Sequence, residues 1–165
     1  MFDAILLFIH ILAAALYVGP QVFLAVAAVP AMRTIEDVQQ RMRATRMVTT
    51  RFGWLGGGAL LTLIVTGLFN YDHANDLGFI DSGDFPRYFA VLQVKLTLVV
   101  VVVLLTLLHG GLLGRRLLRL QEEQAPEEEI AAVRRWSMLA SIANLTLSVA
   151  ILLCAALLGS DWSKQ

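Results

Sequence analysis

The chain has 165 residues, of which 58% are hydrophobic and only 16% are charged. A soluble domain of this length would be about half apolar and a quarter charged, so the composition excludes an ordinary soluble fold. The formal net charge of zero gives no electrostatic basis for nucleic-acid binding. The single cysteine excludes an intrachain disulfide and a metal motif of paired cysteines.

Four long apolar runs follow one another along the chain, at approximately residues 4–29, 53–71, 88–111 and 136–158. Each is about as long as a helix must be to cross the hydrocarbon core of a bilayer, roughly 20 residues. Runs of this length without period-two alternation predict helices rather than barrel strands. We therefore expect an all-α protein, with residues 1–165 forming one four-helix bundle in a lipid bilayer. The first run follows Asp3 and is too long for a signal peptide, so we expect it to be retained.

The arginines are concentrated in two of the three connecting segments. Residues 31–52 and 112–135 are rich in arginine, whereas residues 72–87 hold four aspartates and a single arginine. The positive-inside rule then predicts that these two arginine-rich segments are cytoplasmic and that both termini lie outside. The small size and the lack of a signal peptide favour a prokaryotic inner membrane. We expect residues 31–52 to form an amphipathic helix along the headgroups, residues 112–135 a charged helical hairpin, and residues 72–87 an outer loop.

Each predicted helix carries one stripe of polar residues at helical spacing. Tyr17 and Gln21 fall within about 20° of His10 around the first helix, since 7 and 11 residues are nearly whole turns. Polar side chains in membrane helices face the interior of a bundle, so we expect the stripes to line its centre. The stripes on the other three helices are Thr62, Thr66, Asn70 and His73; Tyr88, Lys95, Thr106 and His109; and Ser137, Ser141, Asn144 and Ser148.

The depths of these residues restrict which of them can act together. At 1.5 Å per residue, His10 and Lys95 lie about 9 Å and Thr66 about 6 to 8 Å below the outer boundary. His109 lies about 30 Å below the same boundary. His10, Lys95 and Thr66 are therefore predicted to share one level, whereas His10 and His109 cannot ligate one metal ion or one haem. Whether His73 reaches His10 depends on whether residues 72–87 fold inward.

Two interpretations are open for the most informative residues. His10 is either a metal or haem ligand or a neutral hydrogen-bonding group between helices, and Lys95 is either functional or extends to the headgroups. Gly53 and Gly57 have the spacing of a close helix contact, with space for a flat cofactor as the alternative. No acidic residue lies inside a predicted helix, so hydrolytic catalysis is not expected; any enzymatic activity would be that of an oxidoreductase.

Short motifs resemble a known group of membrane proteins. The segment HILAAALYVG, with His10, Tyr17 and Gly19, resembles the first-helix signature of the CopD-type copper-resistance membrane proteins, with tyrosine where tryptophan is more usual. The Thr-Gly pair at 66–67 and the seven-residue spacing from Tyr88 to Lys95 are similar to that family's second and third helices.

A second likeness is to the HemJ-type protoporphyrinogen oxidases. In these proteins a lysine and a later histidine share one helix, as Lys95 and His109 do here. The chain departs from the HemJ pattern in two places. The first helix lacks the Pro-Arg that follows the aromatic residue, and the fourth has Ala-Asn where Asn-Glu is expected.

The resemblance implies an integral membrane protein of copper handling or haem chemistry. It places a haem b or a copper ion in the outer half of the bundle, with His10 as the axial or metal ligand and Lys95 balancing a haem propionate. Tyr17, Thr66 and His109 are the further candidates for cofactor binding. The alternatives are a copper transport component, a haem-dependent porphyrinogen oxidase, and a ligand-free accessory subunit of a homo-oligomer or larger membrane complex.

Overall fold

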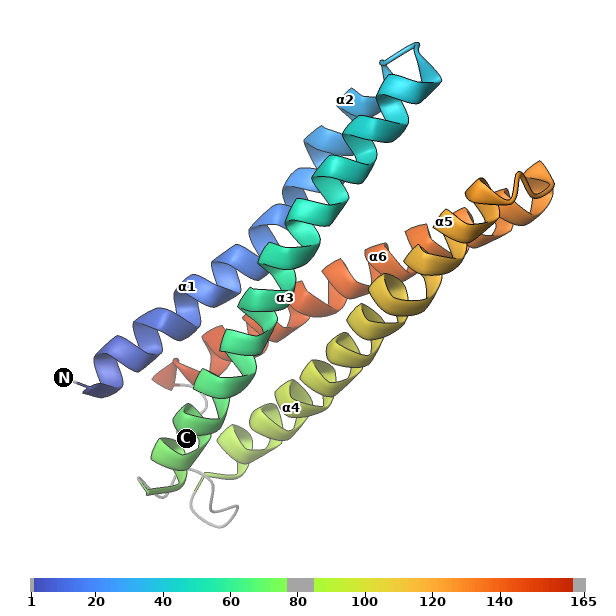
Figure 1. Cartoon of the computed structure of the whole chain (residues 1–165). Helices are drawn as coiled ribbons and strands as arrows, with labels where there is room; N and C mark the ends of the chain where they lie inside the picture. The colour runs from blue at the N-terminus through green and yellow to red at the C-terminus, as the bar shows by residue number, and fades with distance from the viewer. Residues whose placement is uncertain (1, 77–84, 162–165) are drawn as a thin grey trace. The chain divides into compact units, whose positions relative to one another are not determined.

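The computed structural model describes residues 2–76 and 85–161 (Figure 1), apart from the side chains of residues 118, 121 and 122. These residues are almost entirely helical, include no strand, and contain four helices long and apolar enough to cross a membrane. The prediction of an all-α protein with four membrane-length helices is confirmed. The chain divides into two compact units, residues 1–78 and 79–165, each of which is an antiparallel helical hairpin.

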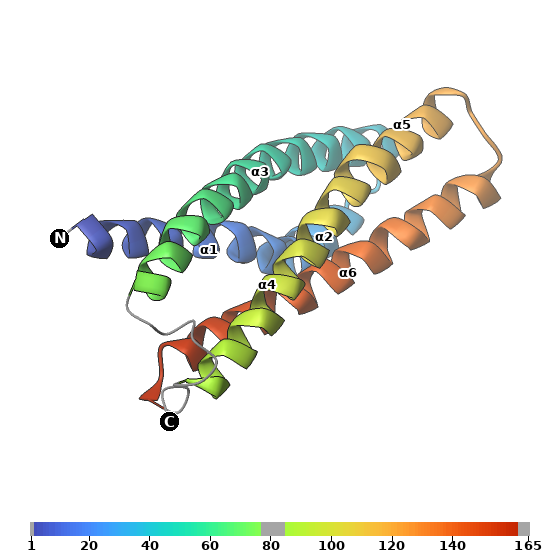
Figure 2. The same ribbon diagram turned by 90° about the horizontal axis from the view of Figure 1, so that it is seen from below.

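Unit 1 is built from a segmented first helix and a long second one. Its antiparallel helices lie side by side in two views (Figures 1 and 2) and are joined by a four-residue turn. The carboxylate of Asp37 in this turn accepts the backbone N–H groups of Gln39 at 2.7 Å and Gln40 at 3.2 Å, which caps the second helix. The elements are α1 (Phe2–Phe23), the π-helical turn η1 (Leu24–Ala28), α2 (Val29–Arg33) and α3 (Val38–Asp76).

The π-helical turn in unit 1 lies where a proline interrupts the first helix. Pro30 has no N–H to donate, and its ring would collide with a carbonyl of the preceding turn. The chain meets this by widening the helix just before the proline, so that the N–H of Val29 reaches back five residues to the carbonyl of Leu24. The rod therefore continues to Arg33 as one membrane-length helix.

The segment predicted to lie along the headgroups, residues 31–52, is helical but is not a separate element. Most of it is the N-terminal part of α3, which runs without a break from Val38 to Asp76. Residues 38–52 are therefore not a separate helix, and their placement along the headgroups stays a prediction. Once the Asp37 cap starts the helix, no proline interrupts its ladder of backbone hydrogen bonds before the membrane span begins. The predicted outer loop, residues 72–87, is also shorter than expected, because α3 extends to Asp76. The central part of this loop lies outside the described residues.

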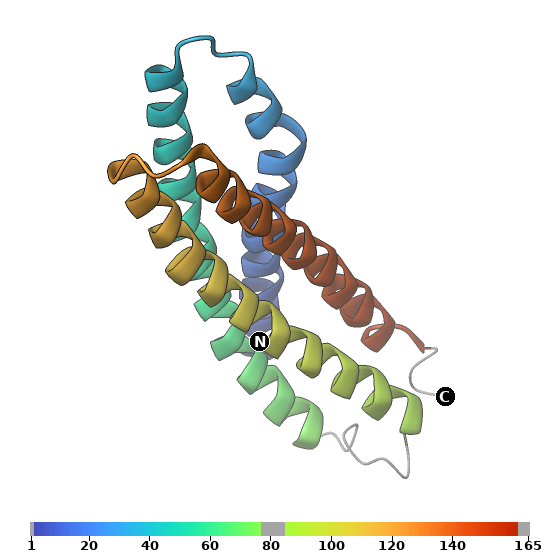
Figure 3. The same cartoon turned by 90° about the vertical axis from the view of Figure 1, so that its right-hand side faces the viewer.

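Unit 2 repeats the plan of unit 1. A segmented rod is followed by an antiparallel helix that lies beside it, as Figure 3 shows. Again a π-helical turn interrupts the first rod, here at two consecutive glycines, Gly110 and Gly111. The elements are α4 (Pro86–Leu107), η2 (Leu108–Leu113), α5 (Gly114–Glu122) and α6 (Glu127–Leu158).

The turn of unit 2 depends on one residue in the left-handed region. Gln124 has a φ of 52°, and the next N–H, that of Ala125, bonds back to the carbonyl of Leu120 at 3.0 Å. This is the Schellman type of helix ending, in which glycine is the preferred residue. The chain then turns at Pro126 and enters α6.

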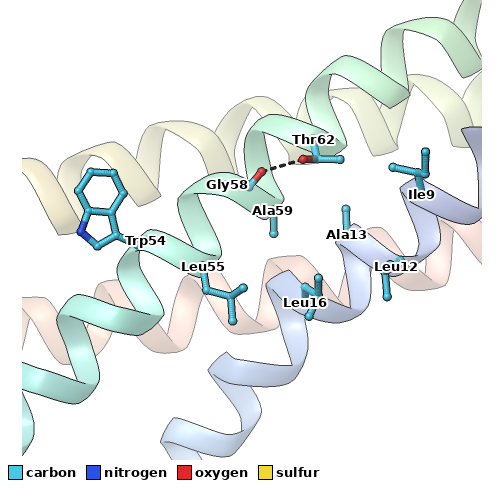
Figure 4. Close-up of a pocket in the computed structure, with 9 residues that line it drawn as sticks. All are labelled: Ile9, Leu12, Ala13, Leu16, Trp54, Leu55, Gly58, Ala59 and Thr62. Atoms are coloured by element: carbon cyan, nitrogen blue, oxygen red, sulfur yellow. Dashed lines mark hydrogen bonds between the residues drawn. The ribbon is translucent and has the colours of Figure 1, made fainter.

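The two helices of unit 1 contact each other through small residues, but these are alanines rather than the glycines singled out in the sequence. Ala13 and Ala59 are buried and point toward one another (Figure 4). A Cβ atom added to Gly53 or Gly57 would meet no described atom of the unit within 4 Å. Within unit 1 the close contact is made by Ala59, two residues beyond Gly57 and six beyond Gly53, and helix packing by these glycines stays a prediction.

Candidate functional site

The strongest polar contact in unit 1 joins His10 of α1 to Thr66 of α3. The imidazole Nδ1 lies 2.7 Å from the Thr66 hydroxyl oxygen, and Thr66 is only 5% exposed. The two residues are 56 positions apart, so the contact exists only because the hairpin brings α1 and α3 together. The prediction that His10 and Thr66 share one level is confirmed.

The Thr66 hydroxyl determines which ring nitrogen of His10 carries the proton. This hydroxyl donates its single hydrogen to the carbonyl of Thr62 at 2.7 Å, one turn back along α3. Its oxygen can then only accept, so Nδ1–H of His10 is the donor. In a neutral imidazole this leaves the lone pair on Nε2. The hairpin therefore holds His10 in the tautomer with its proton on Nδ1 and its lone pair on Nε2.

A glycine gives the imidazole its place beside α3. A Cβ added to Gly67 would lie 3.6 Å from Cε1 of His10, which is ordinary van der Waals contact. The edge of the ring between its two nitrogens thus lies against the backbone of α3. A methyl group fits at this position, whereas a longer side chain would occupy the space of the ring.

Tyr17 and Gln21 continue the polar stripe of α1 away from His10. Tyr17 is 6% exposed and lies about 10 Å along the helix from His10, too far for both to contact one small ion. The Gln21 side-chain amide donates to the Tyr17 carbonyl at 3.0 Å. The stripe is therefore real, but in the described structure its residues do not converge on His10.

An open groove runs along the same hairpin (Figure 4). It has a volume of about 320 Å³ and walls of apolar side chains from α1 and α3. The hydroxyl of Thr62, its main polar group, donates to the carbonyl of Gly58 at 2.9 Å. The groove thus presents an apolar surface along the hairpin of α1 and α3. Its lining consists of Ile9, Leu12, Ala13, Leu16, Trp54, Leu55, Gly58, Ala59 and Thr62.

Lys95 lies on α4 in unit 2. Its side chain is half-buried and interacts electrostatically with Cys154 of α6, which is buried. The predicted role of Lys95 beside a haem propionate stays a prediction.

His109 belongs to the π-helical turn η2 and faces two serines of α6. Its Nδ1 lies 3.5 Å from the hydroxyl of Ser137 and its Nε2 lies 3.4 Å from that of Ser141. The Ser141 hydroxyl donates to the Ser137 carbonyl at 3.0 Å, so Nε2–H of His109 donates to Ser141. Both ring nitrogens thus have hydroxyl partners, as expected for a histidine that joins helices. A cofactor role for His109 stays a prediction.

His73 is not in a loop. It lies in the last turn of α3, is exposed, and is seven residues, or about 10 Å, beyond Thr66 along the helix. Within the described residues, no group of three or more His, Cys, Asp or Glu side chains is arranged to hold a metal ion. His10 is therefore the one imidazole that the described part of unit 1 places against a buried partner.

The chain was compared with known proteins in three ways. No family model, no curated protein and no solved structure matches it.

Proposed function

We propose that this chain is a haem-binding membrane protein in which His10 is the axial ligand of a haem b. Its four long apolar helices make it an integral membrane protein with a lipid bilayer as its environment. The short motifs that resemble the CopD and HemJ groups support haem or copper chemistry; His10 belongs to the CopD-like motif, and Lys95 and His109 to the HemJ-like one.

The tautomer of His10 carries the proposal. Histidines that ligate metals usually donate their other ring N–H to a protein acceptor, which orients the ring and raises its basicity. The 2.7 Å bond from Nδ1–H to the back-bonded Thr66 hydroxyl is such an arrangement, and it is formed inside one hairpin. Thr66 is thus the positioning residue and Nε2 of His10 the ligand atom.

The donor set favours haem over a bare copper ion. A bare ion needs several protein ligands, whereas a porphyrin supplies four nitrogens and leaves the protein to provide one or two. Within its hairpin, His10 contacts the neutral hydroxyl group of Thr66. Bound haem iron would supply one-electron redox chemistry.

The visible spectrum and metal content of the protein, purified in a mild detergent, test the proposal. We expect a Soret band and about one iron per chain. His10→Gly should abolish the band, added imidazole should restore it, and Thr66→Val should weaken haem affinity about 10-fold or more. His73→Ala is the matched control, because it removes an exposed histidine of the same hairpin.

Each other outcome decides against haem. A colourless, metal-free and folded protein would overturn the proposal, and a Soret band that survives in His10→Gly without imidazole would place the ligand elsewhere. Copper without haem would favour a transport component instead. Lys95→Met in the same spectra tests the role predicted for that lysine.

A further inference from the structure

Four arginines of unit 2 lie at one level of its helical hairpin. Arg115 and Arg116 begin α5, Arg134 and Arg135 lie on α6, and all four are exposed. α5 and α6 pack against each other and are joined by the turn at Gln124 (Figure 3). Arg116 lies six residues before the end of α5 at 122, and Arg134 seven residues after the start of α6 at 127.

The contacts deeper in the hairpin give the same register. His109 lies between Ser137 and Ser141, and Thr106 donates to Asn144 at 3.3 Å, so residues at one level have numbers that sum to about 246 to 250. The antiparallel register thus places Arg115 and Arg116 within about one turn of the level of Arg134 and Arg135.

The level of these arginines matches the phosphate region of a bilayer. Residues 96–114 and 136–160 contain no charged residue, so the four arginines are the first charges beyond the apolar span on both helices. Trp136, which is 66% exposed, directly follows Arg135. Exposed tryptophan is typical of the boundary between acyl chains and headgroups.

The positive charge of this arginine cluster is not neutralised locally. Among the side chains that the structure describes, no carboxylate forms an ion pair with any of the four arginines. The nearest glutamates along the chain are all five to eight residues away, about 8 to 12 Å along the helix axes: Glu122, Glu123, Glu127, Glu128 and Glu129. Such distances approach the Debye length at physiological ionic strength.

We infer that the cluster of Arg115, Arg116, Arg134 and Arg135 is a binding site for the headgroup of an anionic phospholipid. Guanidinium groups bind phosphate in a two-pronged geometry, and four of them at one level suit a headgroup with a net negative charge. The exposed apolar side chains next to the cluster, Leu112 and Leu139, would contact its acyl chains. This lipid site is independent of the haem proposal.

Quenching of Trp136 by brominated lipids tests the site directly. Trp54→Phe and Trp162→Phe leave Trp136 as the only tryptophan, and this parent is placed in phosphatidylcholine vesicles with brominated phosphatidylglycerol or brominated phosphatidylcholine. Each arginine near a membrane surface is worth about a fivefold preference. We expect phosphatidylglycerol to be preferred about 10-fold or more beside Trp136.

Matched variants identify the residues responsible. Arg115→Gln with Arg135→Gln should lower the preference about fivefold or more, and the same pair changed to Lys should retain most of it. Arg33→Gln with Arg43→Gln is the control, because it removes the same charge from exposed positions of unit 1.

Three results would overturn the inference. The first is equal quenching of the parent by both lipids, a result that does not depend on how any arginine variant folds. The second is an equal loss of preference in the control pair. The third is loss of the preference when sodium phosphate replaces sodium chloride at equal ionic strength, which would identify a site for soluble anions instead.

Discussion

Thr66→Val is the most direct perturbation of the His10 site. Valine keeps the shape of threonine but has no acceptor, so Nδ1–H of His10 loses a 2.7 Å bond at a position that is 5% exposed. Hydrogen bonds between membrane helices are worth about 0.6 kcal/mol on average and up to about 1.7 kcal/mol. The short distance and the buried acceptor place this one toward the upper end, so we expect a coupling energy of about 1–2 kcal/mol.

The coupling energy comes from a double-mutant cycle of Thr66→Val and His10→Leu, measured by unfolding in mixed micelles of a mild detergent and SDS. Thr97→Val is the matched control: Thr97 is exposed, and its hydroxyl donates to the carbonyl four residues back at 2.9 Å. It should change the free energy of unfolding by less than about 0.5 kcal/mol. A coupling energy near zero, or an equal loss for Thr97→Val, would refute the assignment of Thr66 as the acceptor of His10.

Three further predictions concern single positions. Gly67→Ala should leave the free energy of unfolding within about 0.5 kcal/mol of the wild type, because the new methyl group makes ordinary contact with His10. Gly67→Leu should displace the imidazole ring and therefore destabilise the protein as much as His10→Leu in the same unfolding assay. Gln124→Gly should stabilise the turn of unit 2 by about 0.5–1 kcal/mol, seen as slower amide exchange in α5, because glycine has no penalty at a φ of 52°. Val102→Ala should lower the free energy of unfolding by about 1–3 kcal/mol, because Val102 is 2% exposed and the loss of its two methyl groups leaves a cavity. An unchanged free energy of unfolding would mean that the helices of unit 2 move together and fill this cavity.

The apolar spans were predictable from the sequence, but the ends of the helices were not. Hydrocarbon requires every backbone group to bond within the helix, so the spans must be helical. Outside the span water can satisfy the backbone, and local features decide. The Asp37 carboxylate starts α3 at Val38, about 15 residues before the predicted start. The turn at Gln124 depends on a residue type that rarely adopts positive φ. Its position could therefore not be predicted from the usual turn-forming residues.

The level shared by His10 and Thr66 was predictable because it needs only the rise per residue and a hairpin with a short turn. The contact between Ala13 and Ala59 was not predicted, because the stripe of glycines gave a stronger signal on the same helix. Glycine at the spacing of a helix contact shows that a close approach is possible. Which turn of α3 meets α1 depends on the crossing of the two helices, and that is set by the whole interface.

The tautomers of His10 and His109 follow from one rule that the sequence does contain. A serine or threonine in an apolar helix donates its hydrogen to the carbonyl one turn back, and then offers only a lone pair to a neighbouring helix. Thr66 does this at 2.7 Å and accepts from Nδ1–H of His10; Ser141 does it at 3.0 Å and accepts from Nε2–H of His109. The rule therefore predicts opposite neutral tautomers, which ¹⁵N chemical shifts of selectively labelled histidine distinguish. Matching shifts at the two rings would show that the hydroxyl groups do not control the imidazoles, and the case for Nε2 of His10 as a ligand atom would fail with them.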